Sequence, residues 1–154
     1  METSKILASA LVGTTAMTMF SYLVSEAENK NFREPDVLGE LIERLPERKS
    51  NDSAQIGGWL AHYAVGIVFV ACFNELWKRK IVNPSVTTGA LLGAASGLAG
   101  ISAWKGSFVA HPNPPSKNLK PFFGHLVLAH AVFGIFSSLT YKLITKKEIP
   151  GWNE

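Results

Sequence analysis

The feature that most constrains this chain is the absence of charged residues over four long stretches. No Asp, Glu, Lys or Arg occurs in residues 6–25, 53–74, 81–104 or 121–141. Each run is 20 to 24 residues long, and about 20 apolar residues are needed for a helix to cross a bilayer core of roughly 30 Å. A soluble amphipathic helix would carry charges on its wet face. The sequence therefore predicts a protein that crosses a membrane four times.

The runs predict an all-α fold: an integral membrane four-helix bundle, formed by a single membrane domain of residues 1–154. The predicted spans are about residues 6–25, 54–77, 84–104 and 121–144. The first run is longer than the apolar core of a typical signal peptide, which has about 7–15 residues. We therefore interpret it as a retained span, and we expect the lipid bilayer to be the first partner of the chain.

A short amphipathic helix is predicted between the first two spans, at about residues 36–46. Its apolar positions recur at the spacing of one helical stripe: Val37, Leu38, Leu41, Ile42 and Leu45. Asp36 is the expected N-cap and Pro46 the expected end. We interpret the segment as a helix that lies on the membrane surface or caps the bundle. The alternative is a solvated helical hairpin loop without membrane contact.

Glycines at helical spacing predict close packing between helices. Gly89, Gly93 and Gly97 form a ladder of small residues four apart, which lets another backbone approach closely. The same packing role is expected of three further glycines: Gly58, Gly66 and Gly134. The ladder has its partner either inside the bundle or on a second copy, so a homo-oligomer or a membrane complex is expected.

The remaining composition excludes several classes of function. A single cysteine, Cys72, rules out an intramolecular disulfide and a thiolate metal cluster. The net charge of +3 comes from basic residues near span ends, where membrane topology explains them, so no nucleic-acid partner is expected. The runs contain no Ser–His–Asp or paired-carboxylate pattern, so no catalytic residue is predicted. The dense cluster Lys78-Arg79-Lys80 favours termini on the cytoplasmic side.

The four histidines are predicted to lie in one half of the membrane. His62 and His130 each lie nine residues beyond the start of a charge-free run, in spans of the same direction, so both are about 13 Å deep. His125 is about one turn shallower, and His111 is in the loop at the same mouth. Together with Tyr63, these histidines are the candidate ligand-binding residues.

Several interpretations of this histidine cluster stay open. Two facing histidines could ligate haem b, because the glycines one turn away would admit a flat macrocycle. A divalent metal, a quinone head group or a proton are further options. The structural alternative is that His62 and His130 form hydrogen bonds across helices.

Parts of the sequence resemble a known family. The stretches concerned are Gly13–Met17, Gly58–Phe69, Pro112–Pro114 and His130–Gly134. They are similar to a family of small, four-span bacterial inner-membrane proteins that is grouped only as a domain of unknown function. The resemblance implies the four-span fold and a location in the bacterial inner (cytoplasmic) membrane. It implies no activity.

The sequence thus favours an accessory or interaction subunit of a membrane complex, without covalent chemistry of its own. The glycine ladder and the predicted surface helix support this hypothesis. The alternatives are a transporter of a small solute or of protons, and a redox subunit that binds haem or quinone through His62 and His130.

Overall fold

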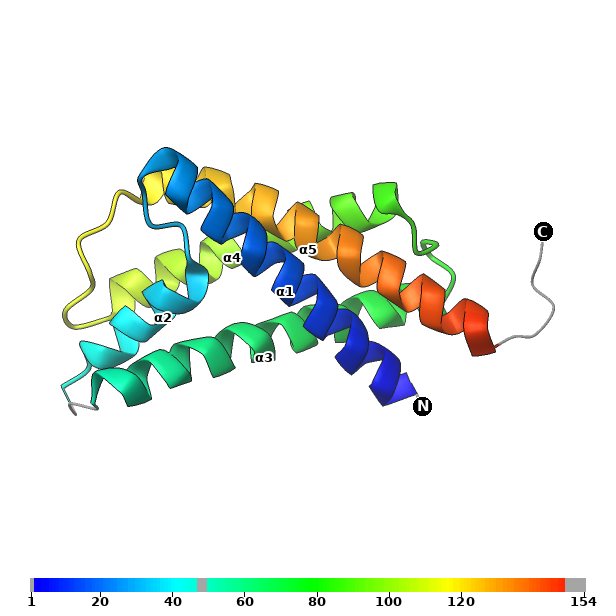
Figure 1. The fold of residues 1–154 in the computed structure, drawn as a ribbon, viewed down its shortest axis with the longest axis horizontal. Helices are drawn as coiled ribbons and strands as arrows, with labels where there is room; N and C mark the ends of the chain where they lie inside the picture. The colour runs from blue at the N-terminus through cyan, green and yellow to red at the C-terminus, as the bar shows by residue number, and fades with distance from the viewer. Residues whose placement is uncertain (1, 47–49, 149–154) are drawn as a thin grey trace.

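Five helices make up the protein in a computed structural model, which describes residues 2–46 and 50–148. They are α1 (Glu2–Glu28), α2 (Glu34–Glu43), α3 (Asn51–Lys78), α4 (Val86–Ala110) and α5 (Leu119–Glu148), drawn in Figure 1. The four helices other than α2 are long and apolar enough to cross a membrane. The predicted all-α fold is confirmed, and the chain is a multi-pass membrane protein.

The long helices extend beyond the charge-free runs at most of their ends, because helical hydrogen bonding continues outside the apolar core. The start of α4 is the exception, since the helix begins at Val86 and not at residue 84. Ser85 is its N-cap. The Thr88 amide donates to Ser85 Oγ at 3.2 Å, and the Ser85 amide donates to Thr88 Oγ1 at 3.1 Å. This capping box fixes the start of the helix.

The short helix α2 differs from the prediction at both of its ends. Arg33, and not Asp36, is the N-cap residue. Pro35 lies in the first turn, where its fixed φ suits a helix start. The last helical residue is Glu43, so the helix ends before Pro46. The predicted N-cap was wrong because a proline in the first turn set the boundary, a signal that the hydrophobic stripe does not carry.

The helix α2 caps one end of the bundle instead of lying freely on a surface. Val37 is completely buried and Leu41 is nearly so. A Cβ placed on Gly58 of α3 would lie 2.5 Å from the amide nitrogen of Gly39 in α2. This approach of two backbones is possible because both residues lack a side chain. The segment is therefore a helix packed on the bundle and not a solvated hairpin.

The long helices are arranged so that α1 crosses α3 and α5, while α4 lies along α5. The start of α1 and the turn between α3 and α4 lie at one end of the bundle. There Lys78 Nζ is 3.8 Å from Glu2 Oε2. The helix α2 and the loop after α4 lie at the opposite end. At that end His111 Nε2 donates to the Leu41 carbonyl oxygen at 2.8 Å.

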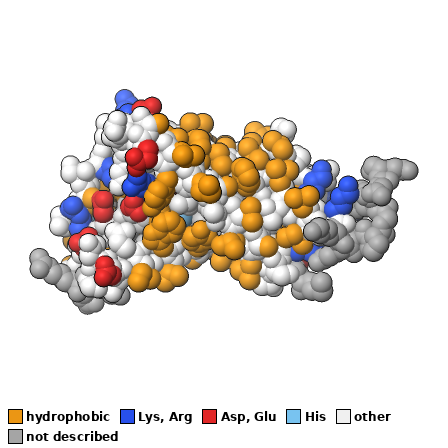
Figure 2. All heavy atoms as spheres, in the orientation of Figure 1, with side chains coloured by type: hydrophobic (Ala, Val, Ile, Leu, Met, Phe, Trp, Pro, Cys, Tyr) orange, Lys and Arg blue, Asp and Glu red, His pale blue; other side chains and the backbone are white. Residues whose placement is uncertain are grey.

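The middle of the molecule is apolar on its outside, while polar side chains of the long helices turn inward among the apolar core residues. Figure 2 shows a broad band of hydrophobic side chains across the middle of one face, with charged side chains at both ends. The inward face of α1 is instead a row of hydroxyl groups, each at most 6% exposed: Ser9, Thr14, Thr18, Ser21 and Ser25. Hydroxyls turn inward because lipid offers them no hydrogen-bond partner.

The closest contact between long helices joins α4 to α5. A Cβ on Gly93 would lie 2.8 Å from the carbonyl carbon of His130, and one on Gly134 would lie 2.7 Å from the amide nitrogen of Gly93. A Cβ on Gly97 would lie 2.9 Å from the Cα atom of Val127. Gly89 likewise faces the carbonyl oxygen of Gly134. The glycine ladder thus packs within the same chain.

Candidate functional site

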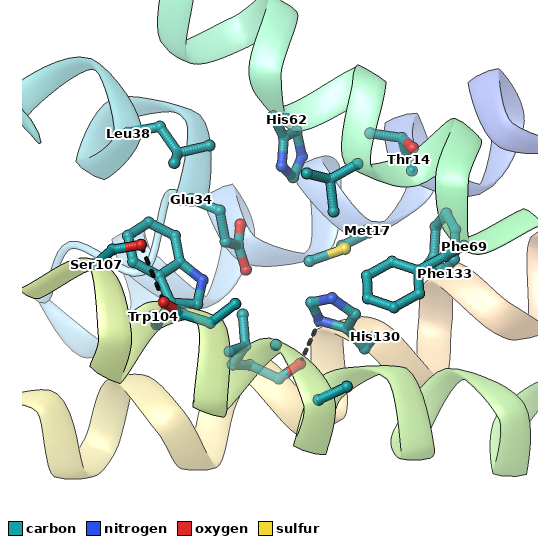
Figure 3. A pocket seen from close by; sticks show the side chains of 16 residues that line it. Thr14, Met17, Glu34, Leu38, His62, Phe69, Trp104, Ser107, His130 and Phe133 are labelled. Atoms are coloured by element: carbon teal, nitrogen blue, oxygen red, sulfur yellow. Dashed lines mark hydrogen bonds between the residues drawn. The ribbon is translucent and has the colours of Figure 1, made fainter. Parts of the chain in front are cut away.

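A cavity of about 420 Å³ lies inside the half of the bundle that α2 caps. All five helices contribute to its wall. Phe69, Trp104 and Phe133 are among its apolar lining residues, and Glu34, His62 and His130 are its ionisable lining residues. Figure 3 shows the Glu34 carboxyl group and the two imidazole rings around the same hollow. A mostly apolar cavity with a few polar groups is typical of a small-molecule site.

The cavity opens sideways between α3 and α4. These two helices follow each other in the chain but scarcely touch, whereas α4 packs along α5 and α2 packs on α3. Val65 of α3 is half exposed, and Ala99 and Ala103 of α4 are exposed, although all three line the cavity. Both helices are candidate membrane spans, so an opening between them lies on a side of the bundle that lipid would cover.

His62 presents a hydrogen-bond acceptor that the protein does not use. Its Nε2 atom is 2.9 Å from Thr18 Oγ1. The Thr18 hydroxyl donates its only proton to the Thr14 carbonyl oxygen at 2.7 Å, so His62 Nε2 must be the donor in the first bond. The Nδ1 atom of His62 therefore carries a lone pair, and no described residue donates to it.

His130 also keeps one ring nitrogen with an unused lone pair, but a different contact fixes its proton. Its Nδ1 atom donates to the Leu126 carbonyl oxygen, one turn earlier on α5, at 2.8 Å. A carbonyl oxygen only accepts, so Nδ1 carries the proton and Nε2 keeps the lone pair. A ring nitrogen fixed by a backbone carbonyl in this way orients the other nitrogen toward a ligand.

Glu34 supplies the carboxyl group of the cavity and is only 2% exposed. Its Oε1 atom accepts a hydrogen bond from Ser21 Oγ at 2.9 Å, whereas Oε2 has no partner among the described residues. Burial raises the pKa of Glu34 to about 8, against the lowering effect of hydrogen bonds from its own backbone and from Ser21. A buried carboxyl with an unused oxygen is a costly arrangement for stability alone.

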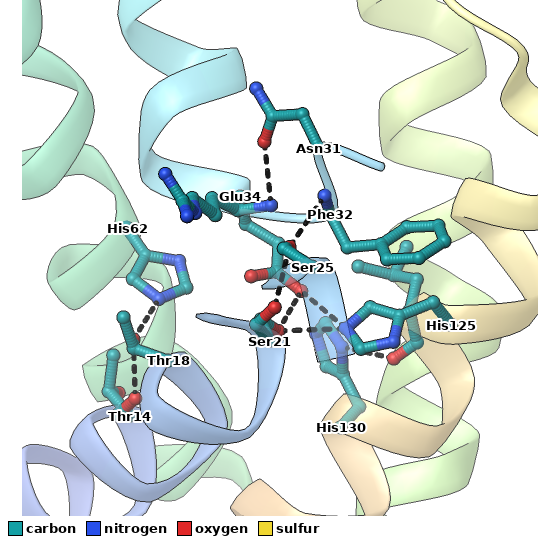
Figure 4. A network of polar contacts seen from close by, with 12 residues as sticks. Thr14, Thr18, Ser21, Ser25, Asn31, Phe32, Glu34, His62, His125 and His130 are labelled. Carbon is teal, nitrogen blue, oxygen red and sulfur yellow. Dashed lines mark hydrogen bonds and ion pairs between the residues drawn. The ribbon is translucent and has the colours of Figure 1, made fainter. Parts of the chain in front are cut away.

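Ser21 joins Glu34 to His125, as the dashed lines in Figure 4 show. His125 Nε2 is 2.9 Å from Ser21 Oγ and 4.0 Å from Glu34 Oε1. The His125 ring is stacked between Phe20 and Phe32, with centroid distances of 5.4 and 4.6 Å. Because its ring is enclosed in this way, His125 positions Ser21 and Glu34 and does not itself line the cavity.

Besides His125, two further candidate residues lie outside the cavity. His111 accepts a hydrogen bond from the Asn113 amide at Nδ1 and donates one to Leu41 at Nε2. Its imidazole therefore ties the loop after α4 to α2. Tyr63 lies on the outer side of α3, where its hydroxyl is 3.0 Å from Thr15 Oγ1. Neither residue is among those that line the hollow.

The glycines beside the histidines do not supply the flat slot that haem b needs. Gly58 is covered by the backbone of α2, and Gly134 is covered by the backbone of α4. Gly66 packs against the Thr14 side chain. No group of three or more His, Cys, Asp or Glu side chains in the described ranges could hold a metal ion. The geometry instead brings together one carboxyl group and two neutral acceptors.

Glu34 is the residue that the sequence reasoning missed. It belongs to the strongly charged segment between the first two spans, where an acidic residue is ordinarily solvated. The available signal was its position directly before Pro35 and three residues before the buried stripe begins at Val37. That placement turns the first residue of α2 toward the same interior as the stripe.

Comparisons with known protein families, with characterised proteins and with solved structures found no match to this chain. The resemblance to a bacterial membrane family therefore stays a prediction, and it transfers no functional residue.

Proposed function

We propose that this protein binds a lipophilic small molecule within the membrane and performs no covalent chemistry on it. The observation that carries the proposal is the cavity of about 420 Å³, which contains a buried carboxyl oxygen and two ring nitrogens that have no partner among the described residues. Its size lies within the range of roughly 300–1,000 Å³ that is usual for small-molecule sites. The opening beside Val65, Ala99 and Ala103 offers a route from the lipid phase.

Such binding is compatible with the role of an accessory subunit in a membrane complex or homo-oligomer. The glycine ladder does not support that role, because α5 of the same chain covers it. We further propose the bacterial inner membrane as the location, with cytoplasmic termini. The cluster Lys78-Arg79-Lys80 lies at the end where α1 begins, in agreement with the positive-inside rule.

Transport of the bound molecule or of protons is the second candidate function. One observation favours it: buried hydroxyl groups continue beyond the cavity toward the opposite end of the bundle. The side chains of Ser9, Ser137 and Ser138 are fully buried and lack hydrogen-bond partners in the described part of the chain. A row of unsatisfied hydroxyls could support a polar path, as intramembrane polar groups often do.

The test of the proposed function is photolabelling of the protein in lipid nanodiscs. The probe is a medium-chain alcohol with a diazirine in its alkyl chain, a neutral molecule that partitions into lipid. We expect mass spectrometry to find label on peptides that contain Phe69, Trp104 or Phe133. Ala103→Trp fills the opening and should remove this label.

The matched control is Leu98→Trp, on the same helix at a side chain that is 60% exposed and does not line the cavity. It should leave labelling of the cavity unchanged. If labelling were confined to outward-facing residues in the wild type, the proposed function would be wrong.

A further inference from the structure

The three ionisable residues that line the cavity can each present an unused hydrogen-bond acceptor to a ligand. His62 Nδ1 and His130 Nε2 are both lone-pair nitrogens, because each ring donates its proton to the protein. Glu34 Oε2 is a carboxyl oxygen without a donor. An ionised Glu34 therefore completes a set of three acceptors. Thr14 and Trp104 also line the cavity and carry donors, but an ionised Glu34 repels a ligand that is itself an anion, such as a carboxylate or a phosphate.

No basic side chain of the described residues competes for Glu34 inside the cavity. The wall contains neither Lys nor Arg. Arg33, its neighbour in sequence, instead pairs with Glu26 and lies over the Tyr22 ring, with Cζ 4.5 Å from the ring centroid. The nearest cationic candidate is His125, 4.0 Å away on the far side of Ser21. The ionised carboxyl thus lacks a full counter-charge.

The apolar part of the wall also favours a positive charge. Trp104, Phe69 and Phe133 line the hollow, and aromatic faces attract cations, most strongly where water is absent. The sideways opening to lipid requires that the ligand also carries an apolar part. The Glu34 carboxylate, the acceptor atoms and the opening between α3 and α4 therefore all favour an amphiphilic cation.

We propose that the ligand is an amphiphilic primary amine, bound as its ammonium ion with Glu34 as the counter-ion and His62 and His130 as hydrogen-bond acceptors. This inference rests on the proposed function of the cavity. A primary ammonium group has three N–H donors, the same number as the unused acceptors. Its alkyl chain lies toward the opening between α3 and α4.

Binding exchanges one proton for one ammonium ion. In the empty cavity the carboxyl group of Glu34 holds a proton near neutral pH, in keeping with its raised pKa of about 8. An alkylamine is an ammonium ion in solution at that pH, because its pKa is close to that of lysine, about 10.4. When the ammonium ion binds, the carboxyl proton passes to the solvent and the carboxylate stays behind as its partner.

The experiment uses four diazirine probes with the same alkyl chain and different head groups. The heads are a primary amine, an alcohol, a carboxylate and a trimethylammonium group. In wild-type protein in nanodiscs we expect the amine to half-saturate cavity labelling at a concentration at least about tenfold below that of the alcohol, which corresponds to about 1.4 kcal/mol. The carboxylate should label least, and the trimethylammonium probe should label less than the amine because it has no N–H donor.

Glu34→Gln keeps the shape of the side chain and removes the charge. This variant should lower the affinity for the amine to that for the alcohol. The matched control Glu40→Gln lies on the same helix outside the cavity wall and should retain the amine preference.

A second measurement on the wild type does not depend on the folding of a variant. Titration of the amine into weakly buffered protein at pH 6.5 should release close to one proton per amine bound, and the alcohol should release none. Cavity labelling with equal affinity for amine and alcohol, or amine binding without proton release, would overturn the amine proposal and leave the lipophilic site intact. Equal affinity for amine and trimethylammonium would overturn the hydrogen-bonding assignment. Failure of all four probes to label the cavity would instead reject the proposed function.

Discussion

The α4–α5 interface and the α3–α4 gap differ although both involve α4. Along α5, three glycines of α4 and Gly134 let the backbones meet, and a Cβ at Gly93 would lie 2.8 Å from a main-chain carbon. Toward α3, the small residues Ala99 and Ala103 face no matching groove and remain exposed. One side of α4 is therefore sealed and the other is open.

This difference shows what small residues do in a membrane. Helices in lipid gain little from hiding apolar surface, so they associate where their shapes fit and where polar groups find partners. The glycines of α3 are occupied elsewhere, since Gly58 receives α2 and Gly66 receives Thr14 of α1. The side of α3 toward α4 carries larger residues such as Val65 and Phe69. Because only α4 carries small residues at this position and α3 does not, the two helices do not close on each other and a cavity remains between them.

The largest effect on stability is expected from the ionisation of Glu34 inside the cavity. Glu34 has a native pKa raised to about 8 against an ordinary value of 4.5, so its contribution to stability is complete at low pH and is lost as the pH rises toward and through 8. We expect the free energy of unfolding to fall by several kcal/mol across this range, because an ionised carboxyl is costly in an apolar cavity. Thermal unfolding in detergent at pH 5 to 9 measures it.

Glu34→Gln is the control for this pH dependence. The variant should unfold near the wild-type temperature at pH 5 and above it at pH 9, since Gln cannot ionise. The other ionisable groups near Glu34 are His125, Asp36 and Arg33, with His62 and His130 across the cavity. If both proteins lose stability equally with pH, one of these groups must be responsible.

Breaking the sealed side should have the next largest effect. Gly93→Leu places a side chain where the α5 backbone lies, and it should lower the free energy of unfolding by about 3 kcal/mol, as severe overpacking does. Gly106→Leu is the matched control on the same helix, because a Cβ at Gly106 meets nothing within 4 Å. Denaturation of the two variants in mixed micelles gives the comparison. Equal stability of the two would mean that α4 does not pack on α5.

A smaller loss is expected when α2 is released from the loop after α4. His111→Ala removes the hydrogen bond from Nε2 to the Leu41 carbonyl, which should cost about 1 kcal/mol. Cavity labelling should persist, since His111 does not line the hollow. Chemical denaturation and photolabelling of the same sample test both parts. Loss of labelling at full stability would show that His111 acts on the ligand.

The smallest effect on stability is expected from filling the open side. Ala103→Trp projects into the gap between α3 and α4 and should change the free energy of unfolding by no more than about 0.5 kcal/mol, as most exposed substitutions do. Ligand labelling should nevertheless be lost. A large destabilisation would indicate that α3 and α4 are in contact at this position, contrary to the open side described here.

Much of the fold could be predicted from the sequence because the membrane imposes simple rules on length and charge. The four spans follow from runs without charge. The stripe from Val37 to Leu45 predicts a short amphipathic helix, in which Val37 and Leu41 are buried while Leu45 lies beyond the helix and is exposed. The matched depth of His62 and His130 follows from equal residue offsets, and both histidines line one cavity. The start of α2 could not be placed from the stripe, since Pro35 and Arg33 determine it.

The sequence by itself therefore determined the number of spans, the place of the short helix and the half of the bundle that holds the histidines. Each of these depends on local periodicity and on the cost of charge in hydrocarbon. Only the tertiary structure decided that the glycine ladder packs α4 against α5, that α3 stands apart from α4, and that Glu34 lines the cavity. Those outcomes depend on which helix faces another at close range, and a one-dimensional pattern of residue types does not encode that choice of partner.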